Sequence, residues 1–147
     1  MNRKIYALAT ALALAFSFTS CEEDDDAQDY VAPDVISGRW VLEEVGTINS
    51  SGAINYVDAA DTCAPDDLTF EGTMFMSSDN NLNIEGNCAT VTREGTWELV
   101  DGNLEFTVGA EEFRRDVLSL TPAMMVLVYT NTDGNLEFLK YAKDQGE

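Results

Sequence analysis

The sequence predicts an all-β domain over residues 36–147, built as an up-and-down antiparallel barrel of about eight strands. Three observations lead to this prediction. Short runs of alternating apolar and polar side chains are separated by turn residues, and no run keeps a helical period for the length of a helix. One hexapeptide occurs twice, and a Gly-x-Trp triplet also occurs twice. About 110 residues are enough for one domain with one hydrophobic core.

Residues 1–20 have the organisation of a signal peptide. Arg3 and Lys4 precede an apolar run over residues 7–18, which is followed by a threonine and a serine. The run is shorter than the roughly 20 apolar residues that a membrane-spanning helix needs. We therefore expect residues 1–20 to be removed on export.

Cys21 directly follows this segment, at a place where an ordinary signal peptide has no need of a cysteine. The arrangement resembles the bacterial lipobox, in which the cysteine is lipidated and becomes the new N-terminus. Several acyl chains on one residue anchor a protein firmly, because each buried methylene contributes about 0.8 kcal/mol. No later segment has the length and apolarity of a span, so we expect lipid on Cys21 to be the only membrane anchor. The alternative is a secreted protein without lipid.

Residues 21–35 are expected to form a flexible tether. Glu22 to Asp26 are consecutive acidic residues, and few apolar side chains follow them. The segment also resembles the acidic export signal of surface-displayed lipoproteins of the Bacteroidota phylum. That resemblance implies a cell-envelope protein that is lipid-anchored to the outer membrane and faces outward. A merely solvated linker is the alternative.

The strongly acidic composition excludes one class of partner. Removal of residues 1–20 takes away Arg3 and Lys4 and no acidic residue, which changes the formal net charge from −19 to −21. Such a surface repels nucleic acid and anionic lipid headgroups, so nucleic-acid binding is not expected. The charge would suit a basic protein partner, although solubility alone accounts for it.

Cys63 and Cys88 remain as an even pair once Cys21 is lipidated. In an exported protein, which matures in an oxidising compartment, such a pair predicts a disulfide. Metal binding by the two thiolates is the alternative, but the chain has no histidine to complete a zinc site.

Alternating apolar and polar residues identify four strands: Leu68–Glu71, Trp97–Leu99, Leu104–Val108 and Leu136–Phe138. Asp101-Gly102 lies between the second and the third and indicates a hairpin turn, because these residues tolerate positive φ. Residues 124–129 are continuously apolar, as expected of a strand covered on both faces. The hexapeptide at 101–106 recurs at 133–138, which fits a meander of hairpins.

Two Gly-x-Trp triplets are expected to close the barrel. In Gly38-Arg39-Trp40 and Gly95-Thr96-Trp97, the glycine lets the backbone bend and the indole then plugs one end of the core.

With these motifs the chain resembles the lipocalin-like domains of Bacteroidota lipoproteins, over about residues 37–143. In that plan Gly38 and Trp40 match the Gly-x-Trp motif of the first strand. The resemblance also implies a basic residue on the last strand that packs over Trp40, and Lys140 is the candidate. A cation over an indole contributes about 0.5–2 kcal/mol.

The resemblance implies a small hydrophobic or amphipathic ligand inside the barrel. Besides the two tryptophans, the candidates for lining such a site are apolar residues of the predicted strands: Leu42, Phe70, Met74, Met76, Leu99, Phe106 and Met125. The alternative is that the same side chains fill a solid core, as the interior of a small barrel can be completely filled.

The sequence gives little support for catalysis, and we expect no catalytic residues, cofactor or metal. Triads that need histidine are impossible, because the chain has none. The adjacent carboxylates Asp66 and Asp67 would point to opposite faces of a strand. Asn131 to Asn135 offers oxygen ligands for calcium, but it does not match the EF-hand loop and is better explained as a turn.

Two functions remain. The first is a membrane-anchored lipoprotein whose barrel binds a small ligand. The second is a filled barrel that docks another envelope protein or a host component. An open cavity would favour the first, and a filled interior beside an exposed apolar patch would favour the second.

Overall fold

The computed structural model describes residues 33–59 and 63–146. It contains one short helix, α1 (Pro33–Ile36), and nine strands. The strands are β1 (Gly38–Ile48), β2 (Ile54–Asp58), β3 (Asp67–Glu71), β4 (Met74–Leu82), β5 (Cys88–Val100), β6 (Asn103–Val108), β7 (Glu111–Leu120), β8 (Met124–Thr130) and β9 (Leu136–Lys143). Within these described ranges, no helix is long and apolar enough to cross a bilayer.

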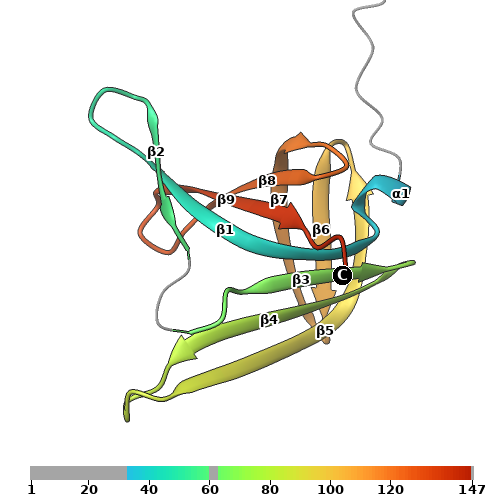
Figure 1. Ribbon diagram of the computed structural model, residues 1–147. Coiled ribbons are helices and arrows are strands. Elements are labelled where there is room, and N and C mark those ends of the chain that lie inside the picture. The colour runs from blue at the N-terminus through green and yellow to red at the C-terminus, as the bar shows by residue number, and fades with distance from the viewer. Residues whose placement is uncertain (1–32, 60–62, 147) are drawn as a thin grey trace, which may run out of the picture.

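The strands form a closed antiparallel barrel. Consecutive strands from β3 to β9 pair as hairpins, and β9 returns to pair with β1. The first half of β1 pairs with β3, and its second half pairs with β2. The barrel therefore has eight strands, β1 and β3 to β9, with β2 as an additional strand at the edge. In Figure 1 the β1–β2 and β4–β5 hairpins project from the barrel away from the end where α1 lies. This confirms the predicted fold class.

The predicted turns and the doubly covered strand are confirmed as well. Asp101 has a φ of 49° and Gly102 a φ of 76°, as the turn between β5 and β6 requires. The side-chain oxygen of Asn131 accepts the backbone N–H groups of Asp133 and Asn135, each at 3.0 Å, so this segment is a closed turn. Residues 125–128 of β8 are all buried.

A disulfide joins Cys63 to Cys88, with Cα atoms 5.6 Å apart, as predicted. It ties the connection between β2 and β3 to the first residue of β5. The bridge therefore attaches that connection to the projecting β4–β5 hairpin.

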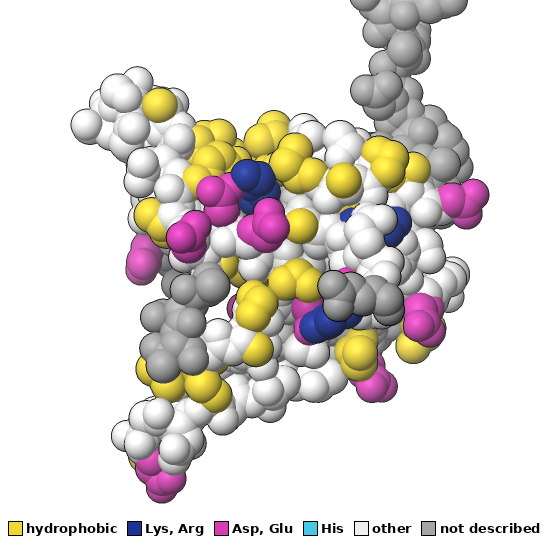
Figure 2. Space-filling view, in the orientation of Figure 1, with side chains coloured by type: hydrophobic (Ala, Val, Ile, Leu, Met, Phe, Trp, Pro, Cys, Tyr) yellow, Lys and Arg dark blue, Asp and Glu magenta, His cyan; other side chains and the backbone are white. Residues whose placement is uncertain are grey.

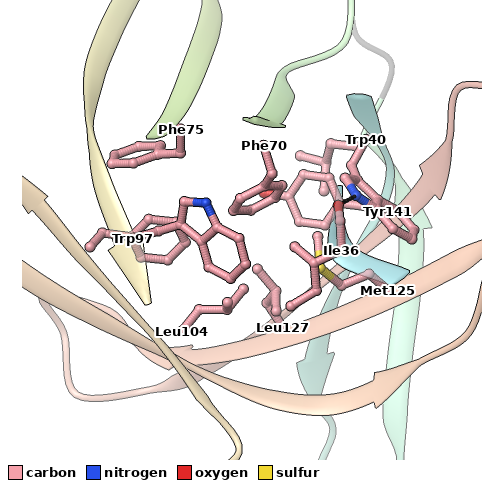
Figure 3. Packing of buried hydrophobic residues seen from close by; sticks show 11 residues of the cluster. Ile36, Trp40, Phe70, Phe75, Trp97, Leu104, Met125, Leu127 and Tyr141 are labelled. Carbon is pink, nitrogen blue, oxygen red and sulfur yellow. Dashed lines mark hydrogen bonds between the residues drawn. The ribbon is translucent and has the colours of Figure 1, made fainter. Parts of the chain in front are cut away.

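The hydrophobic core fills the end of the barrel beside α1 (Figure 3). Trp40, Phe70 and Ile36 are fully buried there. The Phe70 ring meets the Trp97 ring edge-on, with centroids 5.1 Å apart. Such aromatic pairs contribute beyond the area they bury. Residues 33–35, which fall in the predicted tether, belong to the helix that covers this end.

Helix α1 is attached to the barrel by two hydrogen bonds. Trp40 Nε1 donates to the Ile36 carbonyl at 2.6 Å, and Lys143 Nζ donates to the Val35 carbonyl at 3.0 Å. Lys143 Nζ also lies 5.1 Å from the centroid of the Trp40 ring. The expected cation over Trp40 is thus Lys143, and the expectation for Lys140 is wrong. The β1–β9 register places Lys143 opposite Trp40, whereas Lys140 lies opposite Glu44 and forms an ion pair with it.

The two closing glycines are needed for different reasons. Gly38 has a φ of 113°, a backbone conformation that side chains rarely allow. Gly95 is needed for space: a Cβ there would overlap the Thr107 carbonyl oxygen of β6 and lie 2.8 Å from Phe75 Cε1.

Candidate functional site

A cavity of about 220 Å³ occupies the part of the interior that the core does not fill. Its apolar wall consists of aliphatic and aromatic side chains that overlap with the core: Leu42, Leu68, Phe75, Phe106, Phe113, Leu127 and Leu139. Its polar wall consists of charged and hydroxyl-bearing side chains: Asp66, Asp67, Ser77, Asp79, Arg93, Arg115, Tyr129 and Tyr141. The cavity is therefore amphipathic.

Strand alternation explains why these side chains meet. In β4, Phe75 and Ser77 are buried while Met74 and Met76 are exposed. In β7, Phe113 and Arg115 line the cavity, and Arg114 between them is exposed. Every second residue of a strand faces the interior, so each of these strands contributes residues to the cavity at a spacing of two.

Arg115 is the most unusual group in the cavity. Its guanidinium carbon lies 4.1 Å from the centroid of the Tyr129 ring and 5.3 Å from that of Phe113. Burial is the main effect on its pKa, which it lowers below the ordinary value for arginine. Within the described part of the chain, no carboxylate lies within ion-pair distance of it. The guanidinium is therefore a partly desolvated cation that stacks on an aromatic ring without a direct ion pair, although the Glu137 carboxylate raises its pKa from a greater distance.

The neighbouring Tyr129 is held by hydrogen bonds. Its hydroxyl donates to Glu137 Oε2, and Asn131 Nδ2 donates to Glu137 Oε1 at 2.7 Å. Burial, followed by the bond to Glu137, raises the pKa of Tyr129 to about 12. The two hydrogen bonds to its carboxylate lower the pKa of Glu137. Tyr129 is consequently a neutral, fixed ring beneath Arg115.

The three carboxylates of the cavity wall already have partners. Asp67 pairs with Arg39 at 2.9 Å. Asp79 pairs with Arg93 at 3.6 Å, and burial raises the pKa of Asp79. Asp66 accepts a backbone N–H at 2.6 Å.

Two buried hydroxyls have no such partner. Ser77 is 8% exposed and Tyr141 is 6% exposed, and neither hydroxyl has a hydrogen bond within the residues described. Trp97 Nε1 is the only enclosed side-chain polar atom without a partner in that same set. The hydroxyl oxygens of Ser77 and Tyr141 must therefore reach the open space of the cavity. Burial raises the pKa of Tyr141, which stays protonated and able to donate.

The structure separates the predicted lining residues into three groups. Leu42 and Phe106 line the cavity. Phe70 and Met125 are fully buried in the filled core, and Leu99 packs against that core. Met74 and Met76 are 50% and 37% exposed, so the expectation that they face inward is wrong. The register of β4 turns Phe75 and Ser77 inward instead, and a strand cannot present adjacent residues to the same face.

Sequence reasoning missed the polar wall, although one signal for it was present. In Phe113-Arg114-Arg115-Asp116-Val117 the two apolar residues are four apart, and Arg115 lies midway between them on the same face. Cys21, the predicted lipidation site, lies outside the described residues.

No family model and no curated protein matches the sequence. Among solved structures, a lipocalin-like protein from Bacteroides uniformis ATCC 8492 is 16% identical and superposes with a TM-score of 0.50, covering 75% of this chain and 99% of that one. An uncharacterized protein from Bacteroides eggerthii DSM 20697 is 18% identical with a TM-score of 0.48, covering 74% and 99%. A bovine odorant-binding protein in complex with a selenium-containing odorant is 15% identical with a TM-score of 0.47, covering 77% and 73%.

At these identities the likeness concerns the fold alone. It agrees with the closed eight-stranded barrel. The domain has a lipocalin-like fold.

Proposed function

We propose that this protein is a binding protein, not a catalyst, and that its barrel takes up one small amphipathic molecule. The observation that carries the proposal is the cavity of about 220 Å³, with an apolar wall on one side and a polar wall on the other, in which the Ser77 and Tyr141 hydroxyls have no hydrogen bond from the described residues. Pockets for drug-sized ligands measure about 300–1,000 Å³, so the ligand should be smaller than these. Ligand binding in the lipocalin-like structure neighbours, such as the odorant-bound bovine protein, is compatible with this proposal.

The cavity favours a ligand over the alternative of a filled docking module. A filled barrel would leave its interior polar groups either paired or absent, because unpaired polar groups are costly to bury. Here the Ser77 and Tyr141 hydroxyls face open space without a hydrogen bond among the described residues, and Arg115 has only one, to the Arg114 carbonyl. A bound molecule would supply hydrogen-bond acceptors for these donors.

A matched pair of variants on β9 tests the proposal. Leu139 lines the cavity, whereas Leu136, on the same strand, is 44% exposed. Leu139→Trp should fill the cavity, and Leu136→Trp should add the same ring outside it. Neutral probes, hexan-1-ol and 3-phenylpropan-1-ol, would be titrated by calorimetry. We expect saturable binding to the wild type and to Leu136→Trp, and its loss in Leu139→Trp. Absence of saturable binding to the wild type, or unchanged binding to Leu139→Trp, would contradict the proposal.

The same proposal includes the place where the protein works. The segment before Cys21 has the form of a lipoprotein signal, and the Cys63–Cys88 disulfide is typical of exported proteins. The protein would therefore be held at the outer membrane by lipid on Cys21, with the barrel in the periplasm or outside the cell. Cys21→Ala should move the protein from the membrane fraction to the soluble fraction of cells. Retention of this variant in the membrane fraction would refute the lipid anchor.

A further inference from the structure

The polar groups of the cavity differ in whether their hydrogen-bonding and charge requirements are met. All three carboxylates have a partner: Asp67 has Arg39, Asp79 has Arg93, and Asp66 has a backbone N–H. A cationic ligand would have to compete with these existing partners. Each carboxylate of the cavity is therefore already engaged at one of its oxygens, which makes it a weaker partner for a cationic ligand.

The donors of the cavity, in contrast, are largely unused. A guanidinium carries five N–H donors. Of those of Arg115, the structure shows one in use, from Nη1 to the carbonyl of Arg114 at 3.1 Å. The cation is also partly removed from water, which makes the lack of acceptors for its other donors costly. Stacking on Tyr129 fixes the position of the guanidinium but supplies no acceptor.

Two further donors lie on the same wall. The hydroxyls of Tyr141 and Ser77 reach the cavity without a hydrogen bond from the described residues, although both side chains are more than nine-tenths buried. Together with Arg115 they make a group of donors that the carboxylates of the same wall do not satisfy, since neither hydroxyl has a hydrogen bond among the described residues and Arg115 has only the one to the Arg114 carbonyl.

Part of the apolar wall lies close by, on the strand of Arg115 itself and on the neighbouring β6. Phe113 and Arg115 are two residues apart on β7, so both side chains face inward. The Phe106 and Phe113 rings are stacked with centroids 5.0 Å apart. A molecule whose anionic group reached Arg115 could therefore place an aromatic or aliphatic body against these rings.

From this arrangement we infer that the ligand is a small organic anion, with a carboxylate bound to Arg115 and an apolar body against Phe106 and Phe113. The inference rests on the proposed function and names the ligand class of the same cavity. A planar guanidinium matches a carboxylate with two parallel hydrogen bonds, and such charge-assisted bonds are about twice as strong as neutral ones. The selectivity must come from this local contact, since the chain as a whole carries a formal charge of −19 and repels anions.

Three probes with one skeleton and different head groups test the inference: 3-phenylpropanoate, 3-phenylpropan-1-ol and 3-phenylpropan-1-amine. Each would be titrated into the purified protein at neutral pH by calorimetry. We expect the carboxylate to bind at least roughly tenfold more tightly than the alcohol, as the loss of a charged hydrogen bond implies, and the amine to bind most weakly.

Three arginine variants locate the effect. Arg115→Met should reduce carboxylate affinity roughly tenfold to a hundredfold and reduce alcohol affinity much less, so that the preference for the carboxylate is lost. Arg114→Met removes the same charge from the exposed face of β7 and should preserve the preference for carboxylate. Arg115→Lys keeps the charge but not the two-pronged geometry, so it should retain a smaller preference and remains informative if Arg115→Met does not fold.

The outcomes separate the inference from the proposed function. If the alcohol binds as tightly as the carboxylate, or if Arg115→Met keeps the preference, the inference is wrong while a ligand-binding barrel remains. If none of the three probes binds, the proposed function fails together with the inference.

Discussion

The two tryptophans of the core offer a matched pair of variants, Trp40→Phe and Trp97→Phe. Both indoles are buried in the same cluster, and both variants remove the same atoms. They differ in the indole N–H. Trp40 Nε1 donates to the Ile36 carbonyl at 2.6 Å, whereas Trp97 Nε1 has no partner within the described ranges.

This difference sets how much each variant should change the free energy of unfolding. Trp40→Phe leaves the Ile36 carbonyl unsatisfied, which costs about 1–3 kcal/mol, and weakens the contact with Lys143. Trp97→Phe removes a buried donor without a partner, and so it relieves a cost of about 1–3 kcal/mol. We therefore expect the free energy of unfolding to fall by at least about 2 kcal/mol more in Trp40→Phe than in Trp97→Phe.

Urea unfolding followed by far-ultraviolet circular dichroism measures this difference without relying on the tryptophan signal that the variants change. Equal destabilisation of the two variants, or a larger loss in Trp97→Phe, would refute the contribution assigned to the hydrogen bond between Trp40 and Ile36 in attaching α1 to the barrel.

Three further predictions concern the framework of the barrel. Gly95→Ala should lower the free energy of unfolding by about 1–3 kcal/mol, because the added Cβ would overlap the Thr107 carbonyl of the neighbouring strand β6. A decrease of less than about 0.5 kcal/mol in urea unfolding would contradict this expectation. Reduction of the Cys63–Cys88 bridge, which spans 25 residues, should lower the free energy of unfolding by about 3–4 kcal/mol. Identical unfolding midpoints of the oxidised and the reduced protein would contradict this stabilisation. Hydrogen bonds lower the pKa of Glu137 in the folded protein below the ordinary value of 4.5, so ionised Glu137 stabilises the fold above pH 4.5, and this contribution is lost as the pH falls through the folded-state pKa. Glu137→Gln should therefore reduce the loss of unfolding free energy at acid pH. An unchanged acid part of the stability profile in this variant would argue against the hydrogen bonds assigned to Glu137.

Local sequence signals predicted the barrel well because strands and hairpin turns depend on neighbouring residues. The alternation in Leu104–Val108 and the Asp101-Gly102 turn need no knowledge of distant parts of the chain. The repeated hexapeptide correctly indicated two hairpins, since each copy begins in a turn and continues into a strand, β6 or β9.

The errors arose where several registers fit the same residues. Met74, Phe75 and Met76 are all apolar, so the sequence does not show which face of β4 is buried, and a slip of one residue reverses the answer. The assignment of Lys140 failed for a related reason. Which lysine lies over Trp40 depends on the register between β1 and β9, which are neighbours in the barrel but lie at opposite ends of the domain's sequence.

The cavity itself was the hardest feature to predict. Its apolar half could be anticipated from residues such as Leu42 and Phe106. Its polar half depends on charges that face inward, and charged residues are usually found at the surface. Figure 2 shows acidic side chains spread over the visible face of the molecule. Against that background a single inward-facing residue such as Arg115 is recognised only once the strands are paired.

The central claim is that the interior of the barrel, and not its outer surface, binds a small ligand. The most direct test is an NMR titration of isotope-labelled protein with 3-phenylpropan-1-ol and 3-phenylpropanoate, observing aromatic and arginine side-chain signals. We predict saturable shifts that concentrate on Phe106, Phe113 and Tyr141 with either probe, and on Arg115 with the carboxylate. Shifts that do not saturate, or that concentrate on exposed residues of the β4–β5 hairpin such as Ile84, would contradict the claim.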